Sequence, residues 1–156
     1  IPATVSTRGY SQKLGECAVS FFSTKEIQKK LTGSFPKCLN DAPLLLPAAG
    51  THLRSNLDQW INKHHIHPRV VAEFDDSALM KAFGQEGAGI FIAPAVIQAE
   101  VERQYNVVAI GQTDDVTEQF YAISTSRHIS HPVISAVIDV AHELIFSKEK
   151  RISIYS

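Results

Sequence analysis

Long hydrophobic runs are missing from this sequence of 156 residues. Its apolar stretches are a few residues each, whereas a membrane-spanning helix needs roughly 18 or more. Residues 1–4 carry neither the positive charge nor the apolar stretch of a secretory signal. We therefore expect a cytoplasmic protein that makes no contact with a membrane.

Cysteine is also scarce. Cys17 and Cys38 are the two cysteines, and neither belongs to a CxxC pair. Two such thiols do not form the framework of a disulfide-rich secreted domain, which favours a reducing compartment. Because both are followed by apolar residues, we expect them to be small buried hydrophobic side chains.

An excess of charge of one sign is absent as well. The sequence has 15 basic and 16 acidic residues, and the net charge is −1. Such a balance gives no support for nucleic-acid binding by this segment, because duplex-binding surfaces are basic. With 44% hydrophobic and 20% charged residues, the composition is that of a globular domain with a real core.

The hydrophobic pattern alternates between strands and helices. This alternation predicts βαβ units, and hence an α/β domain with a largely parallel sheet flanked by helices. The polar segment 111–118 is expected to be a crossing or hinge segment. The expected strands are 16–22, 44–46, 69–74, 90–92, 107–110 and 120–125, and the expected helices are 52–63, about 77–83, 95–105 and 131–146.

The last expected helix, which Ser130 would cap, has a wide apolar stripe. Together with the apolar strand at Phe120, it requires a larger sheet than we expect this chain to supply. The sequence begins with Ile1 and not with methionine, so we expect a piece of a longer protein whose missing part precedes Ile1. We also expect a dimer or higher homo-oligomer, because large exposed apolar patches are rare.

Catalytic motifs are not found. The sequence has no GxSxG, GxGxxG or GxxxxGK[ST] motif and no cysteine with a recognisable base, so no catalytic residue is assigned and no enzyme is expected. His64, His65 and His67 form a dense cluster and are weak candidates for a metal site. The alternative is that they are solvated residues which complement a helix C-terminus.

Two expected strand-to-helix turns carry polar side chains. In open parallel sheets, ligands bind beyond the carboxyl ends of the strands, where helix N-termini offer free N–H groups. A set of residues at these turns and at the end of the 90–92 strand is therefore a candidate effector site, although capping alone would explain Asp, Ser and Thr there. Its carboxylates would suit a cation. The set is Thr51, His52, Glu73, Asp75, Asp76, Ser77 and Pro94.

Several stretches resemble LysR-type transcriptional regulators. They are EFDDSALMKAFG at residues 73–84 and shorter matches at 15–21, 35–39 and 91–94, and the similarity runs from about residue 14 to 146. The resemblance implies a sensor domain like type II periplasmic binding proteins, in which crossing strands join two α/β lobes. It divides the chain into a lead-in at 1–14, the second regulatory lobe at 15–118, the return strand and helix of an incomplete first lobe at 119–147, and a tail at 148–156.

The resemblance also implies a function. Members of the family sense a small-molecule or ion effector between the lobes, and as oligomers they relay the signal to an N-terminal winged helix-turn-helix, absent here, which contacts DNA. The similarity is to members that activate sodium/proton antiporter genes, so Na⁺ is expected as a possible signal and no cofactor is expected. Two alternatives stay open: a lobe of a periplasmic solute-binding protein, and an enzyme on the same scaffold.

Overall fold

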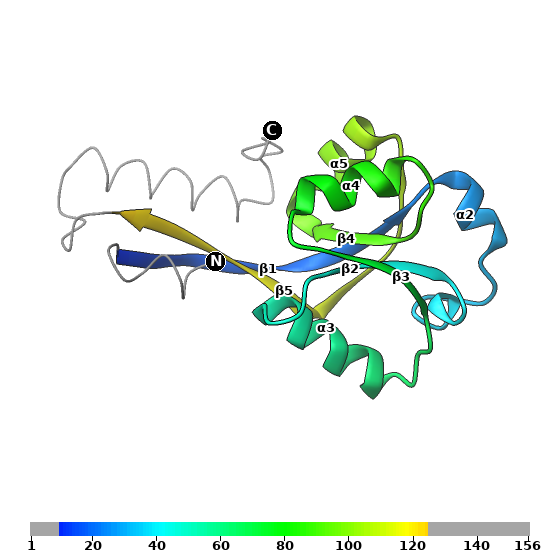
Figure 1. Ribbon diagram of the computed structural model, residues 1–156, viewed down its shortest axis with the longest axis horizontal. Helices are drawn as coiled ribbons and strands as arrows, with labels where there is room; N and C mark the ends of the chain where they lie inside the picture. Colours follow the sequence, from blue (N-terminus) through cyan, green and yellow to red (C-terminus); the bar gives the residue numbers. More distant parts are fainter. Residues whose placement is uncertain (1–9, 125–156) are drawn as a thin grey trace.

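The computed structural model describes residues 10–124, and the side chains of residues 14–120 (Figure 1). Its five strands are β1 (Tyr10–Ser23), β2 (Pro43–Pro47), β3 (Arg69–Phe74), β4 (Phe91–Pro94) and β5 (Val108–Ser124). The helices are α2 (Lys25–Lys30), α3 (His52–Lys63), α4 (Ser77–Gln85) and α5 (Gln98–Tyr105), with short 3-10 turns at Lys37–Leu39 and Ala95–Ile97.

The strands lie in the order β3-β2-β4-β1-β5. β2 and β3 pair in parallel, and a parallel bridge between Leu44 and Ile90 joins β2 to the start of β4. β1 pairs antiparallel with both β4 and β5. Four of these five strands therefore run in one direction and β1 runs against them, which confirms the predicted largely parallel sheet.

Helices cover both faces of this sheet, as the alternation of side chains along each strand requires. Leu44 and Leu46 of β2 belong to a core cluster that includes Leu57 and Trp60 of α3. Leu45, between them, belongs to a second cluster with Met80 of α4 and Val101 of α5. Figure 1 shows α3 on one side of the strands and α4 and α5 on the other. The lobe is thus a three-layer α/β/α structure.

The expected helix starts are confirmed. The Thr51 hydroxyl accepts a hydrogen bond from the backbone N–H of Arg54 (3.1 Å) and caps α3. The Asp76 carboxylate accepts one from the N–H of Ala78 (2.9 Å) and caps α4. Both helices begin directly after the carboxyl end of a parallel strand. Their N-termini therefore lie at one edge of the sheet.

The longest pairing is between β1 and β5, which extends from Tyr10 opposite Ser124 to Ser23 opposite Val108. In Figure 1 these two strands continue away from the lobe as a two-stranded ribbon. The polar segment 111–118 lies within β5. It is part of a paired strand with irregularities in register, and not a separate segment between two short strands.

Several residues differ from what their sequence pattern indicates. Leu79 and Phe83, which helical periodicity groups with Met80 in the helix expected at about 77–83, are 49% and 46% exposed. Gly84, expected to end α4, lies inside it and is buried, since the helix continues to Gln85. Cys38 is buried as expected, but Cys17 is only half-buried.

The expected helix 131–146 and its cap Ser130 lie outside the described residues. Phe120, expected to need cover from another chain, is only 9% exposed. The boundaries at residues 15 and 118 of the second lobe stay predictions. Among residues 10–124, no helix has both the length and the apolar character that crossing a membrane requires.

Candidate effector-binding site

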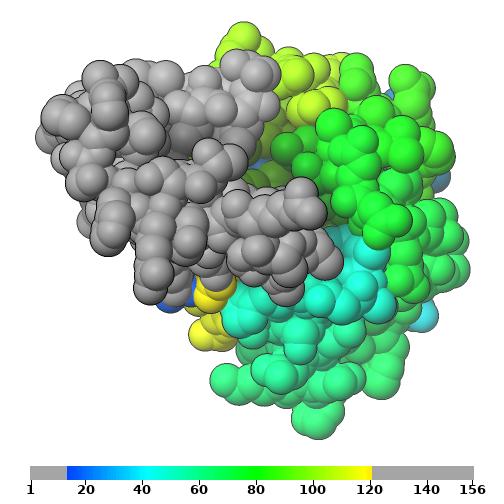
Figure 2. All heavy atoms as spheres, turned by 60° about the vertical axis from the view of Figure 1, so that its left-hand side comes forward, coloured from blue at the N-terminus to red at the C-terminus, as the bar shows by residue number. Residues whose placement is uncertain are grey.

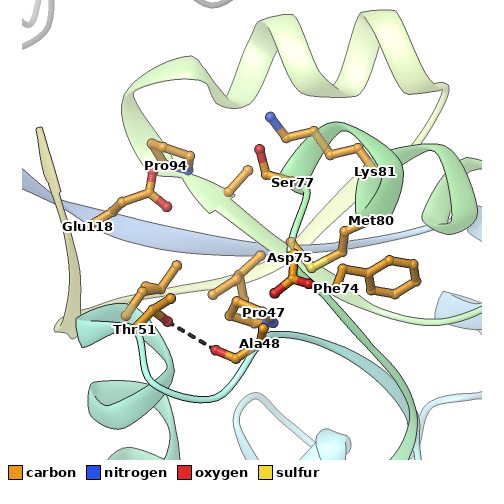
Figure 3. Close-up of a pocket in the computed structure, with 13 residues that line it drawn as sticks. Pro47, Ala48, Thr51, Phe74, Asp75, Ser77, Met80, Lys81, Pro94 and Glu118 are labelled. Carbon is orange, nitrogen blue, oxygen red and sulfur yellow. Dashed lines mark hydrogen bonds between the residues drawn. The ribbon is translucent and has the colours of Figure 1, made fainter. Parts of the chain in front are cut away.

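A cleft of about 120 Å³ opens at the carboxyl ends of β2, β3 and β4 (Figure 3). In the space-filling view, the β2–α3 segment (cyan to green) and the α4 segment (green) meet on this face of the lobe (Figure 2). The wall is partly apolar and partly polar. The lining residues are Pro47, Ala48, Thr51, Leu53, Phe74, Asp75, Ser77, Met80, Lys81, Ile92, Ala93, Pro94 and Glu118.

Four residues of the predicted site line this cleft: Thr51, Asp75, Ser77 and Pro94. They come from the two helix starts and from the end of β4, as the argument from parallel strands required. The Thr51 hydroxyl is already engaged, because besides capping α3 it donates to the carbonyl oxygen of Ala48 (3.2 Å). The structure therefore brings together the turns that the sequence singled out.

The other three predicted residues do not line the cleft. Glu73 accepts a hydrogen bond from the Arg54 guanidinium on the α3 side of the sheet (2.9 Å). The Asp76 carboxylate caps α4 by accepting a hydrogen bond from the backbone N–H of Ala78. His52 lies with its Nε2 3.1 Å from the side-chain nitrogen of Asn56 and 3.3 Å from that of Gln119. Each of these side chains has a local partner.

The carboxylates of the predicted set, which would suit a cation, include those of Glu73 and Asp75. The structure separates them, because Glu73 is held by Arg54 while Asp75 lines the cleft. Among residues 10–124, no group of three or more His, Cys, Asp and Glu side chains is placed to hold a metal ion.

Two charged residues of the cleft were not in the predicted set. Glu118 comes from β5 and Lys81 from α4, and both side chains are partly buried. Burial raises the pKa of Glu118, and the charge of Lys81 opposes that rise. Burial lowers the pKa of Lys81, and the charge of Glu118 opposes that change. The two groups thus attract each other across the cleft in a partly desolvated setting.

Cys17 lies opposite Glu118 in the β1–β5 pairing. Burial raises the pKa of its thiol to about 11, and the negative charge of Glu118 adds to the rise, while backbone hydrogen bonds from Val96 and Ala95 oppose it. Cys17 is therefore a neutral thiol at physiological pH.

With this geometry in place, comparison with known proteins decides the family. The family model of the LysR substrate binding domain matches residues 34–145. The chain belongs to this family. The Escherichia coli (strain K12) transcriptional activator protein NhaR is 35% identical over 142 residues, which are 91% of this chain and 46% of NhaR. NhaR of Shigella flexneri matches equally well. The chain thus spans about half the length of these relatives.

Solved structures of LysR-type regulators share the fold. The regulatory domain of HypT from Salmonella typhimurium, in its apo form, superposes with a TM-score of 0.63 at 12% identity, over 90% of this chain and 68% of that one. The AmpR effector binding domain from Citrobacter freundii gives 0.63 at 16% identity, over 88% and 68%. These likenesses confirm the type II periplasmic-binding-like α/β architecture for this LysR domain.

The histidine cluster of the LysR domain lies away from the cleft residues, beyond the end of α3. The His64 ring packs on Trp60 at 5.1 Å between centroids, and His65 has a left-handed backbone with φ of 54°. His67 is exposed and donates its backbone N–H to the side-chain oxygen of Asn40 (2.7 Å). These contacts belong to the turn that links α3 to β3.

A sequence signal for Lys81 existed. Ser77 and Lys81 are four residues apart, which places them on the same face of α4. Once Ser77 was assigned to the cleft, Lys81 followed from helix geometry. Glu118 has no predicted cleft residue close to it in the sequence. It reaches the cleft through the pairing of β5 with β1.

Proposed function

We propose that this chain is the effector-sensing part of a LysR-type transcriptional activator of the NhaR kind. It has no catalytic role. The signal binds in the cleft, and a winged helix-turn-helix outside this chain contacts DNA. The family membership and the 35% identity to NhaR support this proposal. The protein would then act in the cytoplasm, where its DNA target lies.

One observation carries the location of the signal site. Glu118 lines the cleft and also belongs to β5, one of the two strands that leave the lobe as a ribbon (Figures 1 and 3). A ligand that contacts both Glu118 and α4 would bind some angles between lobe and ribbon more tightly than others. Such differential affinity is what a ligand needs to shift a conformational equilibrium.

We further propose that the whole regulator responds to Na⁺, as its resemblance to activators of antiporter genes implies. If Na⁺ binds this chain directly, the carboxylates that line the cleft, those of Glu118 and Asp75, would be its oxygen ligands. Titrating the chain with NaCl against KCl, followed by NMR, tests this point. Equal spectra in the two salts would place the sodium response outside this chain.

We propose a homo-oligomer as well. Four large apolar side chains stay exposed on β3 and α4, namely Val70, Val71, Leu79 and Phe83. Large apolar side chains left exposed in this way support an interface with another chain. Analytical ultracentrifugation of the chain tests this, and a monomer over the whole concentration range would contradict it.

Blocking the cleft in the full-length regulator tests the signal site. Ser77→Trp adds bulk at an exposed residue of the cleft wall, where it does not disturb the core. We expect loss of induction in a reporter assay while DNA binding in vitro is retained. Ser55→Trp, at an exposed position of α3 outside the cleft lining, is the matched control. Normal induction of the Ser77 variant would refute the assignment.

A further inference from the structure

The charges of the cleft are arranged on opposite walls. Lys81 and Ser77 project from α4, and Glu118 projects from β5 beside Pro94 (Figure 3). The third charged group, Asp75, is exposed, and Figure 3 shows its carboxylate on the side of Pro47 and Ala48, away from Ser77 and Lys81. The cleft therefore presents one wall suited to an anion and another suited to a cation.

The α4 wall has three features that favour an anionic group. The Lys81 side chain supplies an ammonium, and the Ser77 side chain supplies a hydroxyl. Ser77 is the first residue of α4, where the helix dipole is positive, and Lys81 follows one turn later. The cleft is also lined by apolar side chains such as Met80, Ile92 and Ala93. Low local polarity strengthens charge interactions with a bound ligand.

We propose that the ligand of this cleft is a small zwitterion of the amino-acid class, with its ammonium at Glu118 and its carboxylate at Lys81 and Ser77. This inference rests on the proposed function and names the ligand for it. A lone anion would meet the carboxylates of Glu118 and Asp75, and a lone cation would meet Lys81. A ligand with both charges satisfies both walls.

The cleft has a volume of about 120 Å³, which is room for several water molecules. The smallest members of this ligand class are glycine and alanine, so they are the probes. When such a ligand binds, the mutual attraction of Lys81 and Glu118 is replaced by two ion pairs with the ligand.

The test is an NMR titration of the isotope-labelled chain of 156 residues at neutral pH and constant ionic strength. The probes are glycine and L-alanine, with acetate, methylammonium and NaCl as single-charge probes. We expect the two amino acids to cause saturable shifts around Ser77, Lys81 and Glu118. We expect the single-charge probes to bind at least about tenfold more weakly, which corresponds to losing one of the two charge contacts.

Variants assign the two ends of the ligand. Glu118→Gln and Lys81→Gln keep similar side-chain size and remove one charge each, and each should weaken amino-acid binding about tenfold or more. Glu86→Gln and Lys63→Gln remove the same charges at exposed positions outside the cleft lining, and they should leave binding unchanged. If Glu118→Gln does not fold, Lys81→Gln and Ser77→Ala still test the carboxylate end.

Each other outcome overturns the inference. Tight acetate binding that is unchanged in Glu118→Gln would indicate that the ligand is an anion. Na⁺ binding that is lost in Glu118→Gln, without amino-acid binding, would indicate that the ligand is a cation. The absence of binding by either amino acid would also refute it. These results leave the proposed function standing, because that proposal is judged by loss of induction in the Ser77→Trp reporter assay.

Discussion

Gly84 lies where α4 packs closely against the sheet, and the addition of a single methyl group tests this packing. A Cβ atom on Gly84 would lie under 3.0 Å from two ring carbons of Phe91, Cδ1 and Cε1. The Phe91 ring is fully buried and stacks on Phe22, with 5.5 Å between centroids. The ring therefore has little room to move away.

Two opposing terms decide the effect of Gly84→Ala. Alanine in place of glycine inside a helix stabilises by about 1 kcal/mol. Overpacking in a well-packed core costs roughly 1–3 kcal/mol, and the upper end applies here because the clash involves a rigid ring in contact with a second ring. We expect a net destabilisation of about 1–2 kcal/mol.

Urea unfolding followed by circular dichroism measures this difference. Ala82→Gly, at an exposed position of the same helix, measures the difference in helix propensity between alanine and glycine within α4. Subtracting this contribution from the effect of Gly84→Ala gives the packing contribution. Adding Phe91→Leu to Gly84→Ala should restore part of the loss, which a double-mutant cycle would show as coupling. A Gly84→Ala chain more stable than the wild type would refute the packing argument.

Three further predictions concern single side chains. Thr51→Ala removes the cap of α3 and should cost about 1 kcal/mol in urea unfolding, whereas Ser55→Ala on the exposed face should be near neutral. Burial raises the pKa of Glu118 in the folded chain, so folding favours its protonated form. The wild-type chain therefore loses stability relative to Glu118→Gln as the pH rises from the ordinary carboxyl pKa through the raised one. The variant should be more stable than the wild type near pH 7 and equally stable near pH 4. Equal stability of the two proteins at both pH values would contradict this prediction. With its pKa raised to about 11, Cys17 should react with iodoacetamide at pH 8 roughly a hundredfold more slowly than free cysteine, and a rate near that of the free thiol, read by mass spectrometry, would refute this.

Much of the fold followed from local signals in the sequence. Thr51, and either Asp75 or Asp76, are predicted caps because Thr and Asp before an apolar-periodic stretch satisfy helix N–H groups; the structure shows that Asp76 is the second cap. The runs at 44–46 and 90–92 were identified as buried strands because they are apolar at every position, and all of their residues are buried. Signals of this kind need no knowledge of distant parts of the chain.

Features that depend on distant partners were predicted less well. Helical periodicity groups Leu79 and Phe83 with Met80, but the sheet beneath α4 ends at β3, so nothing among the described residues covers them fully. Glu73 was predicted to line the cleft, but its carboxylate accepts a hydrogen bond from Arg54, which is 19 residues away in the chain. Periodicity indicates which side chains share one face of a helix or strand, but it does not indicate which part of the structure contacts that face.

The position of Glu118 shows how much of the candidate site was still readable from the sequence. Phe120, two residues after it, is buried. Because strand side chains alternate, Glu118 shares the face of Phe120, and a carboxylate on a buried face is an informative exception to the usual exposure of glutamate. This exception was hidden because the segment 111–118 was interpreted as a hinge and not as part of a strand. The same pattern explains its proposed role: only a residue that is in the strand, and also in the cleft, can transmit ligand binding to the ribbon.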